Sequence, residues 1–203
     1  MRVKRVGLAD ELADGRIAVV DRFLPVSVCG RMLRETTDGD WVSSRVASSR
    51  GQGLATPVNG RSSSTLVADR YSPWMEAALR RIEESLRTLY GVRPTNLEPW
   101  QMTRYKCGEA FDYHLDCGRW RGHPSGERRR TILIYLEQPI RGGATDFRAL
   151  GNRIRPIVGR LVVWENLLAN GNCNHGMIHS SRPVWQGCKT TLATWERERS
   201  YML

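Results

Sequence analysis

The chain has 203 residues, the size of one ordinary domain with a real hydrophobic core, and we expect a single domain over residues 1–203. Its 40% apolar content and seven Trp exclude a disordered binding segment. No apolar run approaches the roughly 20 residues of a membrane-spanning helix, and the N-terminus lacks the apolar core of a secretion signal, so we expect a cytoplasmic protein.

The formal net charge is +10, and 28 of the 31 basic residues are Arg. Residues 119–160 carry ten Arg against three acidic residues. This segment is either a solvated face or a rim that attracts an acidic partner, such as a protein segment, a nucleotide or a carboxylated small molecule.

The five cysteines form no closely spaced pairs, which is typical of reduced thiols in a cytosolic protein. They are Cys29, Cys107, Cys117, Cys173 and Cys188. A structural zinc site made from three of them and His175 would lack any C-x-x-C spacing, which argues against it.

The N-terminal half predicts two helices separated by an irregular stretch. A short strand at 17–20 leads into a helix over about 26–37. Residues 44–66 are rich in Ser and Gly, and they indicate either a surface loop or a flap over an active site. Ser72 and Pro73 then begin an amphipathic helix that Gly91 ends.

From Leu97 onward the pattern favours short strands. Residues 131–136, 160–165 and 189–195 are strand-like, with turns at glycine-containing pairs between them. We therefore predict a mainly β fold, a jelly-roll or double-stranded β-helix. Supporting helices would occupy about 15–95 and the barrel core about 97–198.

His114 and Asp116 are two residues apart, so in a strand their side chains project from the same face. An imidazole and a carboxylate on one face are two of the three ligands in the facial triad that binds non-haem Fe(II). A surface histidine beside a solvated aspartate would give the same His-x-Asp sequence. The third ligand would be His123, His175 or His179.

Three motifs together resemble the prolyl 4-hydroxylase class of Fe(II)/2-oxoglutarate dioxygenases. They are Tyr105-x-x-Gly108-x-x-Phe111-x-x-His114-x-Asp116, then Gly142-Gly-Ala-Thr145-Asp-Phe147, then His179 followed by Pro183-Val184, Gly187 and Lys189. The resemblance covers about residues 15–198 and implies a double-stranded β-helix. It also implies iron ligands His114, Asp116 and His179, because His175 lacks the matching offsets; His123 would be an ordinary exposed histidine.

The same resemblance assigns a cosubstrate pocket. Lys189 would pair with the distal carboxylate of 2-oxoglutarate, and Tyr105 would hydrogen-bond that carboxylate. Thr145 occupies a position with a similar role, or is a β-structure threonine without a ligand. Strand periodicity places Thr191 on the same face as Lys189. The remaining requirements are Fe(II) and O2, with ascorbate as an optional reductant.

Four residues are candidate substrate contacts. Arg128 aligns with an arginine that touches the peptide in the family, but Arg129 and Arg130 adjoin it. Trp195 matches a pocket tryptophan or is a core aromatic. Phe111 replaces the usual tyrosine, and Arg182 replaces a small residue and could pair with a carboxylate or phosphate.

The resemblance implies hydroxylation of an unactivated C–H with release of succinate and CO2. We expect a prolyl or other residue of a protein or peptide as substrate, with a free amino acid or natural-product intermediate as the alternative. A non-catalytic ligand-binding barrel is a second alternative.

The position of Lys189, ten residues after His179, argues against the nucleic-acid repair dioxygenases. The presence of Asp116 argues against the halogenating relatives of the family. We expect a monomer or weak dimer.

Overall fold

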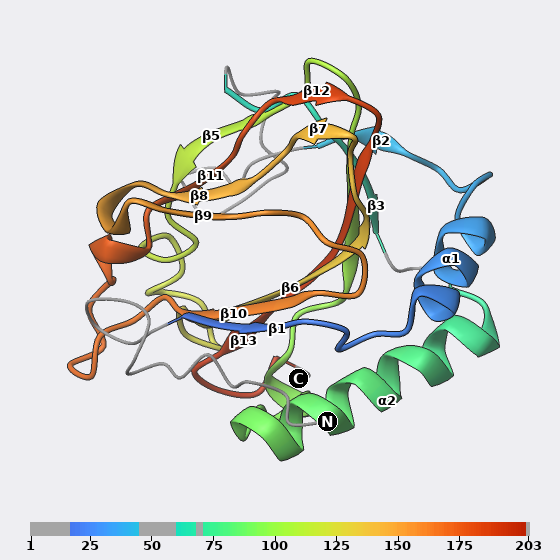
Figure 1. The fold of residues 1–203 in the computed structure, drawn as a ribbon. Coiled ribbons are helices and arrows are strands. Elements are labelled where there is room, and N and C mark those ends of the chain that lie inside the picture. Colours follow the sequence, from blue (N-terminus) through green and yellow to red (C-terminus); the bar gives the residue numbers. More distant parts are fainter. Residues whose placement is uncertain (1–16, 45–59, 68–70, 202–203) are drawn as a thin grey trace.

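The computed structural model describes residues 17–44, 60–67 and 71–201, and its architecture is mainly β, as predicted. A seven-stranded sheet has the order β1-β10-β6-β13-β4-β3-β2, and a four-stranded sheet has the order β5-β11-β8-β9. Strands β12 and β7 form a third, two-stranded sheet. Figure 1 shows the four-stranded sheet opposite strands of the large sheet, as in a double-stranded β-helix.

The strands of the large sheet are β1 (Ile17–Val20), β2 (Val42–Ser43), β3 (Ser64–Val67), β4 (Gln101–Tyr105), β6 (Arg128–Glu137), β10 (Leu161–Glu165) and β13 (Lys189–Arg197). Those of the smaller sheets are β5 (Phe111–His114), β7 (Arg141–Gly142), β8 (Thr145–Phe147), β9 (Asn152–Ile154), β11 (His179–Ser181) and β12 (Val184–Gln186). The described strands pair with one another in antiparallel fashion.

Two helices cover the outer face of the large sheet (Figure 1). They are α1 (Val26–Glu35) and α2 (Pro73–Tyr90), and short 3-10 turns occupy η1 (Pro94–Asn96), η2 (Arg148–Leu150) and η3 (His175–Met177). The Ser72 hydroxyl caps α2 by accepting from the Met75 amide, and Gly91 ends it in a left-handed conformation. Both predicted helices and their ends are confirmed to within two residues.

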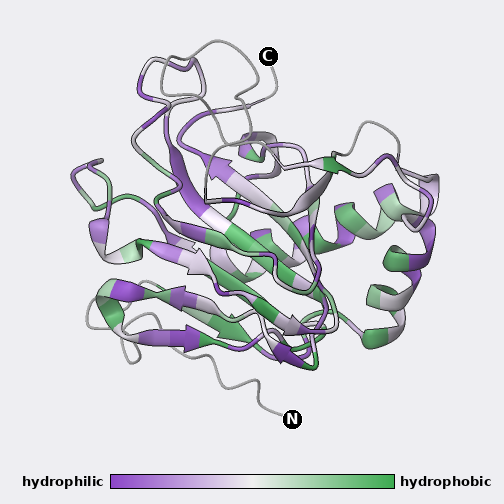
Figure 2. Ribbon diagram, turned by 90° about the horizontal axis from the view of Figure 1, so that it is seen from above, coloured by the Kyte–Doolittle hydropathy of each residue, from purple (hydrophilic) through white to green (hydrophobic). Residues whose placement is uncertain are grey.

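Alternation along β6 separates the core from the barrel interior. Ile132, Ile134 and Leu136 are buried with the apolar face of α2, and Figure 2 shows hydrophobic residues along these strands and along the helices. Thr131 and Leu133, on the opposite face, line a cavity between the sheets. The central strands therefore hold the helices with one face and build the site with the other.

The Ser/Gly-rich stretch at 44–66 is not wholly a loop. Residues 64–67 form β3, which pairs with β4 from Ser64↔Arg104 to Val67↔Gln101. The prediction of an irregular segment is wrong there, because neighbouring strands supply the order that the sequence pattern lacks. Residues 45–59, where an active-site flap was considered, lie outside the described residues.

Candidate metal centre and adjoining cavity

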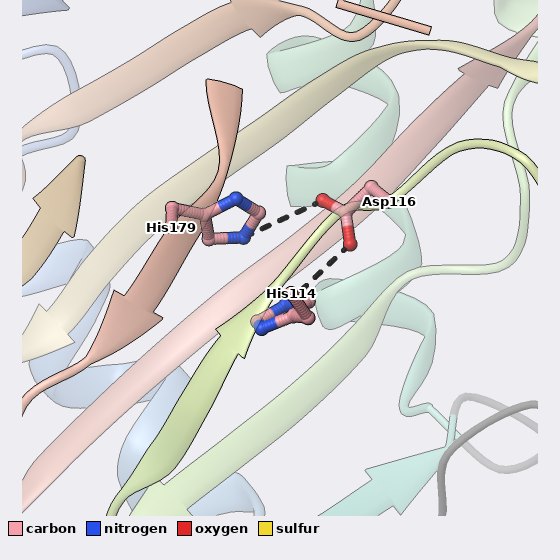
Figure 3. A group of neighbouring side chains, drawn as sticks. All are labelled: His114, Asp116 and His179. Carbon is pink, nitrogen blue, oxygen red and sulfur yellow. Dashed lines mark ion pairs between the residues drawn. The ribbon is translucent and has the colours of Figure 1, made fainter. Parts of the chain in front are cut away.

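Two histidines from neighbouring strands face one carboxylate. His114 ends β5, His179 begins β11, and the two are direct partners in the register of these strands. Asp116 follows His114 by two residues. Its Oδ1 lies 3.7 Å from the Nε2 of His114, and its Oδ2 lies 3.7 Å from the Nε2 of His179 (Figure 3). The three candidate ligand atoms lie within 4.8 Å of one another.

The backbone orients both imidazoles for metal binding. The Nδ1 atom of His114 lies 2.8 Å from the Asp112 carbonyl, and that of His179 lies 2.9 Å from the Met177 carbonyl. A proton on each Nδ1 satisfies these carbonyls and leaves each Nε2 lone pair pointing at Asp116. This is the tautomer that a metal ligand requires.

Burial and neighbouring charges set the ionisation that a metal needs. Desolvation, with a contribution from His179, lowers the pKa of His114 to about 3, so its imidazole is neutral at physiological pH. Burial alone would raise the pKa of Asp116, but the two imidazoles, Arg128 and a hydrogen bond from Thr131 hold it below the ordinary value. Neutral imidazoles and an ionised carboxylate are the donors that a divalent cation binds.

The donor set fits Fe(II). Two imidazoles and one carboxylate, without a thiolate, make the facial arrangement of non-haem iron and leave coordination positions for other ligands. Within the described residues no other group of three His, Cys, Asp or Glu side chains could hold a metal. His175 is exposed in η3, and His123 stacks on Tyr201 instead.

Cys117 and Cys173 form a disulfide, so the prediction that all five cysteines are reduced is wrong for this pair. The two residues are 56 positions apart in the chain, and no sequence spacing points to their pairing. The bond also removes both thiolates from the zinc set considered above. Cys29, Cys107 and Cys188 are free.

A cavity of about 200 Å³ adjoins the three candidate ligands. Ten of the eleven predicted site residues line it, namely His114, Asp116, His179, Lys189, Tyr105, Thr145, Thr191, Arg128, Trp195 and Phe111. The eleventh, Arg182, does not line it. Its guanidinium lies on the outer side, 3.9 Å from Asp146.

Lys189 is a buried cation in the wall of this cavity, with 1% of its surface exposed. Its ammonium group donates to the Gly143 carbonyl at 3.0 Å and to the Ser181 hydroxyl, and lies 4.2 Å from the centre of the Tyr105 ring. Desolvation lowers the pKa of Lys189 to about 7. The described contacts include no carboxylate partner, so an entering anion would stabilise the charge.

Hydroxyl groups and indoles surround the same space. Thr145 is hydrogen-bonded to the Tyr135 hydroxyl at 2.6 Å, and the Thr191 hydroxyl donates weakly to the Thr103 carbonyl at 3.4 Å. Among the cavity-lining residues, Trp164 Nε1, Trp195 Nε1 and Ser180 Oγ are buried polar atoms without a hydrogen-bond partner in the described part of the chain. Buried unpaired polar atoms beside a cavity are the groups that a bound ligand satisfies.

Of the three adjacent arginines on β6, Arg128 faces the cavity. An irregularity in the pairing with β13 sets Arg128 opposite Arg197 and Arg130 opposite Glu196. Arg130 instead contacts α2 through the Tyr90 carbonyl and pairs with Glu165 and Glu196, while Arg129 is exposed.

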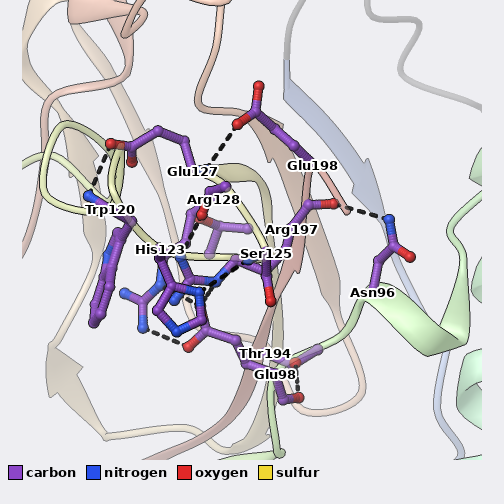
Figure 4. Close-up of polar contacts among 12 residues, drawn as sticks. Asn96, Glu98, Trp120, His123, Ser125, Glu127, Arg128, Thr194, Arg197 and Glu198 are labelled. Atoms are coloured by element: carbon purple, nitrogen blue, oxygen red, sulfur yellow. Dashed lines mark hydrogen bonds and ion pairs between the residues drawn. The ribbon is translucent and has the colours of Figure 1, made fainter. Parts of the chain in front are cut away.

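Glu98 fixes the Arg128 guanidinium. Two hydrogen bonds of 2.7 Å join their side chains (Figure 4). The guanidinium lies 3.7 Å from the centre of the Trp195 ring. Arg197 pairs with the same carboxylate at 2.6 Å and lies over Trp120. This network makes one wall of the cavity rigid and cationic.

Arg61 also lines the cavity, and the sequence analysis missed it. Its Nε donates to the Ser63 hydroxyl at 3.1 Å, and its guanidinium lies 4.6 Å from the centre of the Phe111 ring, which in turn stacks on His114. Burial lowers the pKa of Arg61. The residue lies in the Ser/Gly-rich stretch without periodicity, where the only signal was an arginine before a run of serines.

Comparisons with known proteins agree with this geometry. Residues 100–197 match the sequence model of the 2OG-Fe(II) oxygenase superfamily. The chain is 28% identical to prolyl 4-hydroxylase subunit alpha-1 of Mus musculus over 156 residues, which is 72% of this chain and 29% of that protein. It is 30% identical to prolyl 4-hydroxylase subunit alpha-2 of Gallus gallus over 137 residues, 63% of this chain and 26% of that one. The chain thus spans less than a third of these curated relatives.

Solved structures share the fold. The viral collagen prolyl hydroxylase of Paramecium bursaria Chlorella virus-1, in its 2OG complex, superposes with a TM-score of 0.68 at 21% identity, covering 90% of this chain and 96% of that one. A prolyl hydroxylase of Trichoplax adhaerens, in complex with a hypoxia inducible factor peptide fragment, gives 0.67 at 17% identity, covering 90% and 83%. The predicted double-stranded β-helix is confirmed.

Proposed function

Since residues 100–197 match the 2OG-Fe(II) oxygenase superfamily, we propose that the chain is a 2-oxoglutarate-dependent hydroxylase of a prolyl or other residue in a protein or peptide. The observation that carries the proposal is one cavity lined by the two histidines, one aspartate and a buried lysine. When bound, Fe(II) with 2-oxoglutarate and O2 supplies the oxidising chemistry, and succinate and CO2 are the by-products.

The chain's own residues bind and orient the reactants. His114, Asp116 and His179 would hold the metal on one side and leave the cavity side open. Lys189 would bind the distal carboxylate of 2-oxoglutarate, with Tyr105 beside it, because an ammonium group in a dry wall is stabilised by an anion. Phe111, Trp164 and Trp195 would exclude water from the reacting groups.

Succinate release tests the reaction class. The full chain, supplied with Fe(II), O2 and 2-oxoglutarate, should form succinate, and a peptide substrate should gain 16 mass units in step with it. Asp116→Ala should form none under the same conditions. A wild-type chain that binds 2-oxoglutarate with Fe(II) but never forms succinate with any peptide or amino acid would instead be a binding barrel.

Charge at the cavity narrows the substrate class. Arg61, Arg119, Arg128 and Lys189 line it, whereas Asp116 is its lining carboxylate and belongs to the metal centre. Among the described residues, the lining therefore carries more basic than acidic side chains. We infer a peptide with an acidic residue near the hydroxylated position.

Two peptides with one central proline and either acidic or basic flanks test this inference. The acidic peptide should be turned over faster, with an advantage that shrinks as salt is added and in Arg61→Met. The matched control is Arg80→Met, which removes an exposed charge from α2. Equal rates for the two peptides would contradict an acidic substrate, and turnover of free amino acids alone would favour the small-molecule alternative.

A further inference from the structure

The Asp116 carboxylate, a candidate metal ligand, also accepts a hydrogen bond from a buried hydroxyl. The Thr131 hydroxyl on β6 donates to Asp116 Oδ2 at 2.7 Å. Asn166, which follows β10, donates from Nδ2 to the same hydroxyl oxygen at 2.8 Å. Thr131 and Asn166 are each only 2% exposed, so water does not supply these contacts.

The sheet register brings the threonine and the asparagine together. Thr131 is the direct partner of Trp164 in the pairing of β6 with β10, and Asn166 comes two residues after that tryptophan. The Asn166 backbone is fixed by its amide, which donates to the Arg129 carbonyl at 2.8 Å, and by its carbonyl, which accepts from the Asn174 amide at 2.8 Å. Its side chain is therefore presented to Thr131 by ordered backbone on both sides.

The direction of the hydrogen bonds follows from the chemistry of the groups. A threonine hydroxyl has one proton to donate, and the amide nitrogen of asparagine can only donate. Because Asn166 donates to the hydroxyl oxygen, the hydroxyl proton is available for Asp116 Oδ2. The amide thus directs the hydroxyl proton toward the carboxylate.

We propose that Thr131 and Asn166 are positioning residues that hold Asp116 Oδ2 in a hydrogen bond, so that the carboxylate offers its other oxygen to the metal. A carboxylate can occupy one or two coordination positions. With Oδ2 engaged, Asp116 occupies one, and with His114 and His179 this leaves the positions that 2-oxoglutarate and O2 need. The inference rests on the metal centre of the proposed function, and it adds two residues that are not themselves metal ligands.

Four variants of the full, metal-free chain test the proposal by calorimetric titration with Co(II), without 2-oxoglutarate, O2 or substrate. Thr131→Val removes the donor and keeps the shape, while Thr131→Ser restores the donor. Asn166→Asp replaces the amide donor with an acceptor and draws the hydroxyl proton away from Asp116. Thr190→Val is the matched control, because its buried hydroxyl also donates to a carboxylate, Glu137, at 2.7 Å but lies outside the cavity lining.

We expect Thr131→Val and Asn166→Asp each to weaken Co(II) binding about 10- to 100-fold, the usual loss for a removed partner of a metal ligand. Thr131→Ser and Thr190→Val should bind as the wild type does. Near wild-type affinity in Asn166→Asp, or in a folded Thr131→Val, would overturn the proposal, and so would an equal loss in Thr190→Val. Should Thr131→Val not fold, the Co(II) affinity of Asn166→Asp decides whether the proposal holds.

This test is independent of the hydroxylase proposal, because no turnover is measured. A wild-type chain that binds no Co(II) would refute the metal centre itself.

Discussion

Lys189 is a buried cation whose charge is unfavourable until an anion enters the cavity. At the scale of single residues, strand alternation predicted that His114 and Asp116 share a face. His179 and Lys189 were assigned from the resemblance of three motifs to a known family. Lys189, Thr191 and Trp195 do line the cavity together. Arg61 was missed because the Ser/Gly-rich stretch around it has no periodicity. Three adjacent arginines look alike in the sequence, and which of them faces the cavity depends on an irregularity in the pairing of β6 with β13.

Two of the three candidate third ligands, His175 and His179, can be distinguished by mutation. His179→Ala should abolish tight Co(II) or Fe(II) binding, because His179 Nε2 faces Asp116. His175→Ala is the matched control and should retain wild-type affinity, since His175 is exposed in η3. Calorimetric titration checks both variants. The ligand assignment fails if His175→Ala loses the metal and His179→Ala keeps it.

Cosubstrate affinity should depend on the ionisation of Lys189. With the pKa of Lys189 near 7, 2-oxoglutarate binding should weaken by about tenfold per pH unit above that value, because the free protein must then take up a proton. Lys189→Met should bind 2-oxoglutarate weakly at every pH and still bind Co(II) normally. Pull-down of radiolabelled 2-oxoglutarate between pH 6 and 9 measures this. A pH-independent wild type, or tight binding by Lys189→Met, would contradict the role.

The same lysine makes a prediction for stability. Between pH 7 and the ordinary lysine pKa of 10.5, the unfolded chain holds a proton that the folded chain lacks. The free energy of unfolding of the cosubstrate-free protein should therefore rise with pH across that window. Lys189→Met should lack the rise and, at neutral pH, be more stable by on the order of 1 kcal/mol. Urea unfolding at pH 7 and 9 distinguishes the two proteins.

At the scale of elements, the amphipathic helix and the long central strands were predictable, because length and periodicity mark them strongly. β3 was not, since it is only four residues long, follows a run of serines and owes its conformation to pairing with β4. The disulfide joins Cys117, directly after a candidate metal ligand, to Cys173 in the segment before η3. Contacts of this kind depend on the finished fold, and no local pattern encodes them.

This disulfide should stabilise the protein against unfolding. It joins residues 56 positions apart, for which chain entropy predicts roughly 4 kcal/mol. Cys173→Ser should lower the midpoint of urea unfolding accordingly, and dithiothreitol should lower it in the wild type but not in the variant. Cys188→Ser, at a free cysteine, should change little. Equal stability with and without reductant would argue against the bond.

The helices should support the barrel without entering the chemistry. Leu86 on α2 is fully buried against the outer face of the large sheet, so Leu86→Ala should cost about 2–5 kcal/mol. Leu89 on the same helix is 37% exposed, and Leu89→Ala should cost less than about 1 kcal/mol. In folded samples both variants should bind Co(II) normally. A large loss of metal affinity in folded Leu86→Ala would contradict this division of roles.

At the scale of the whole molecule, the fold positions two imidazoles, a carboxylate and a buried lysine around one cavity. No helix in the described part of the chain is long and apolar enough to cross a membrane. The fold class followed from the order of helices and strands, and the reaction class from the resemblance of three motifs to a known family. The substrate did not follow, because it depends on cavity walls assembled from residues as distant as Arg61, Arg128 and Trp195.

A crystal structure of the full chain grown without O2, with Mn(II) and 2-oxoglutarate, tests the central claim most directly. We predict one ion bound by His114, Asp116 and His179, with the distal carboxylate of 2-oxoglutarate within hydrogen-bonding distance of Lys189 Nζ. An ion bound elsewhere, or a cosubstrate carboxylate that does not contact Lys189, would contradict the account.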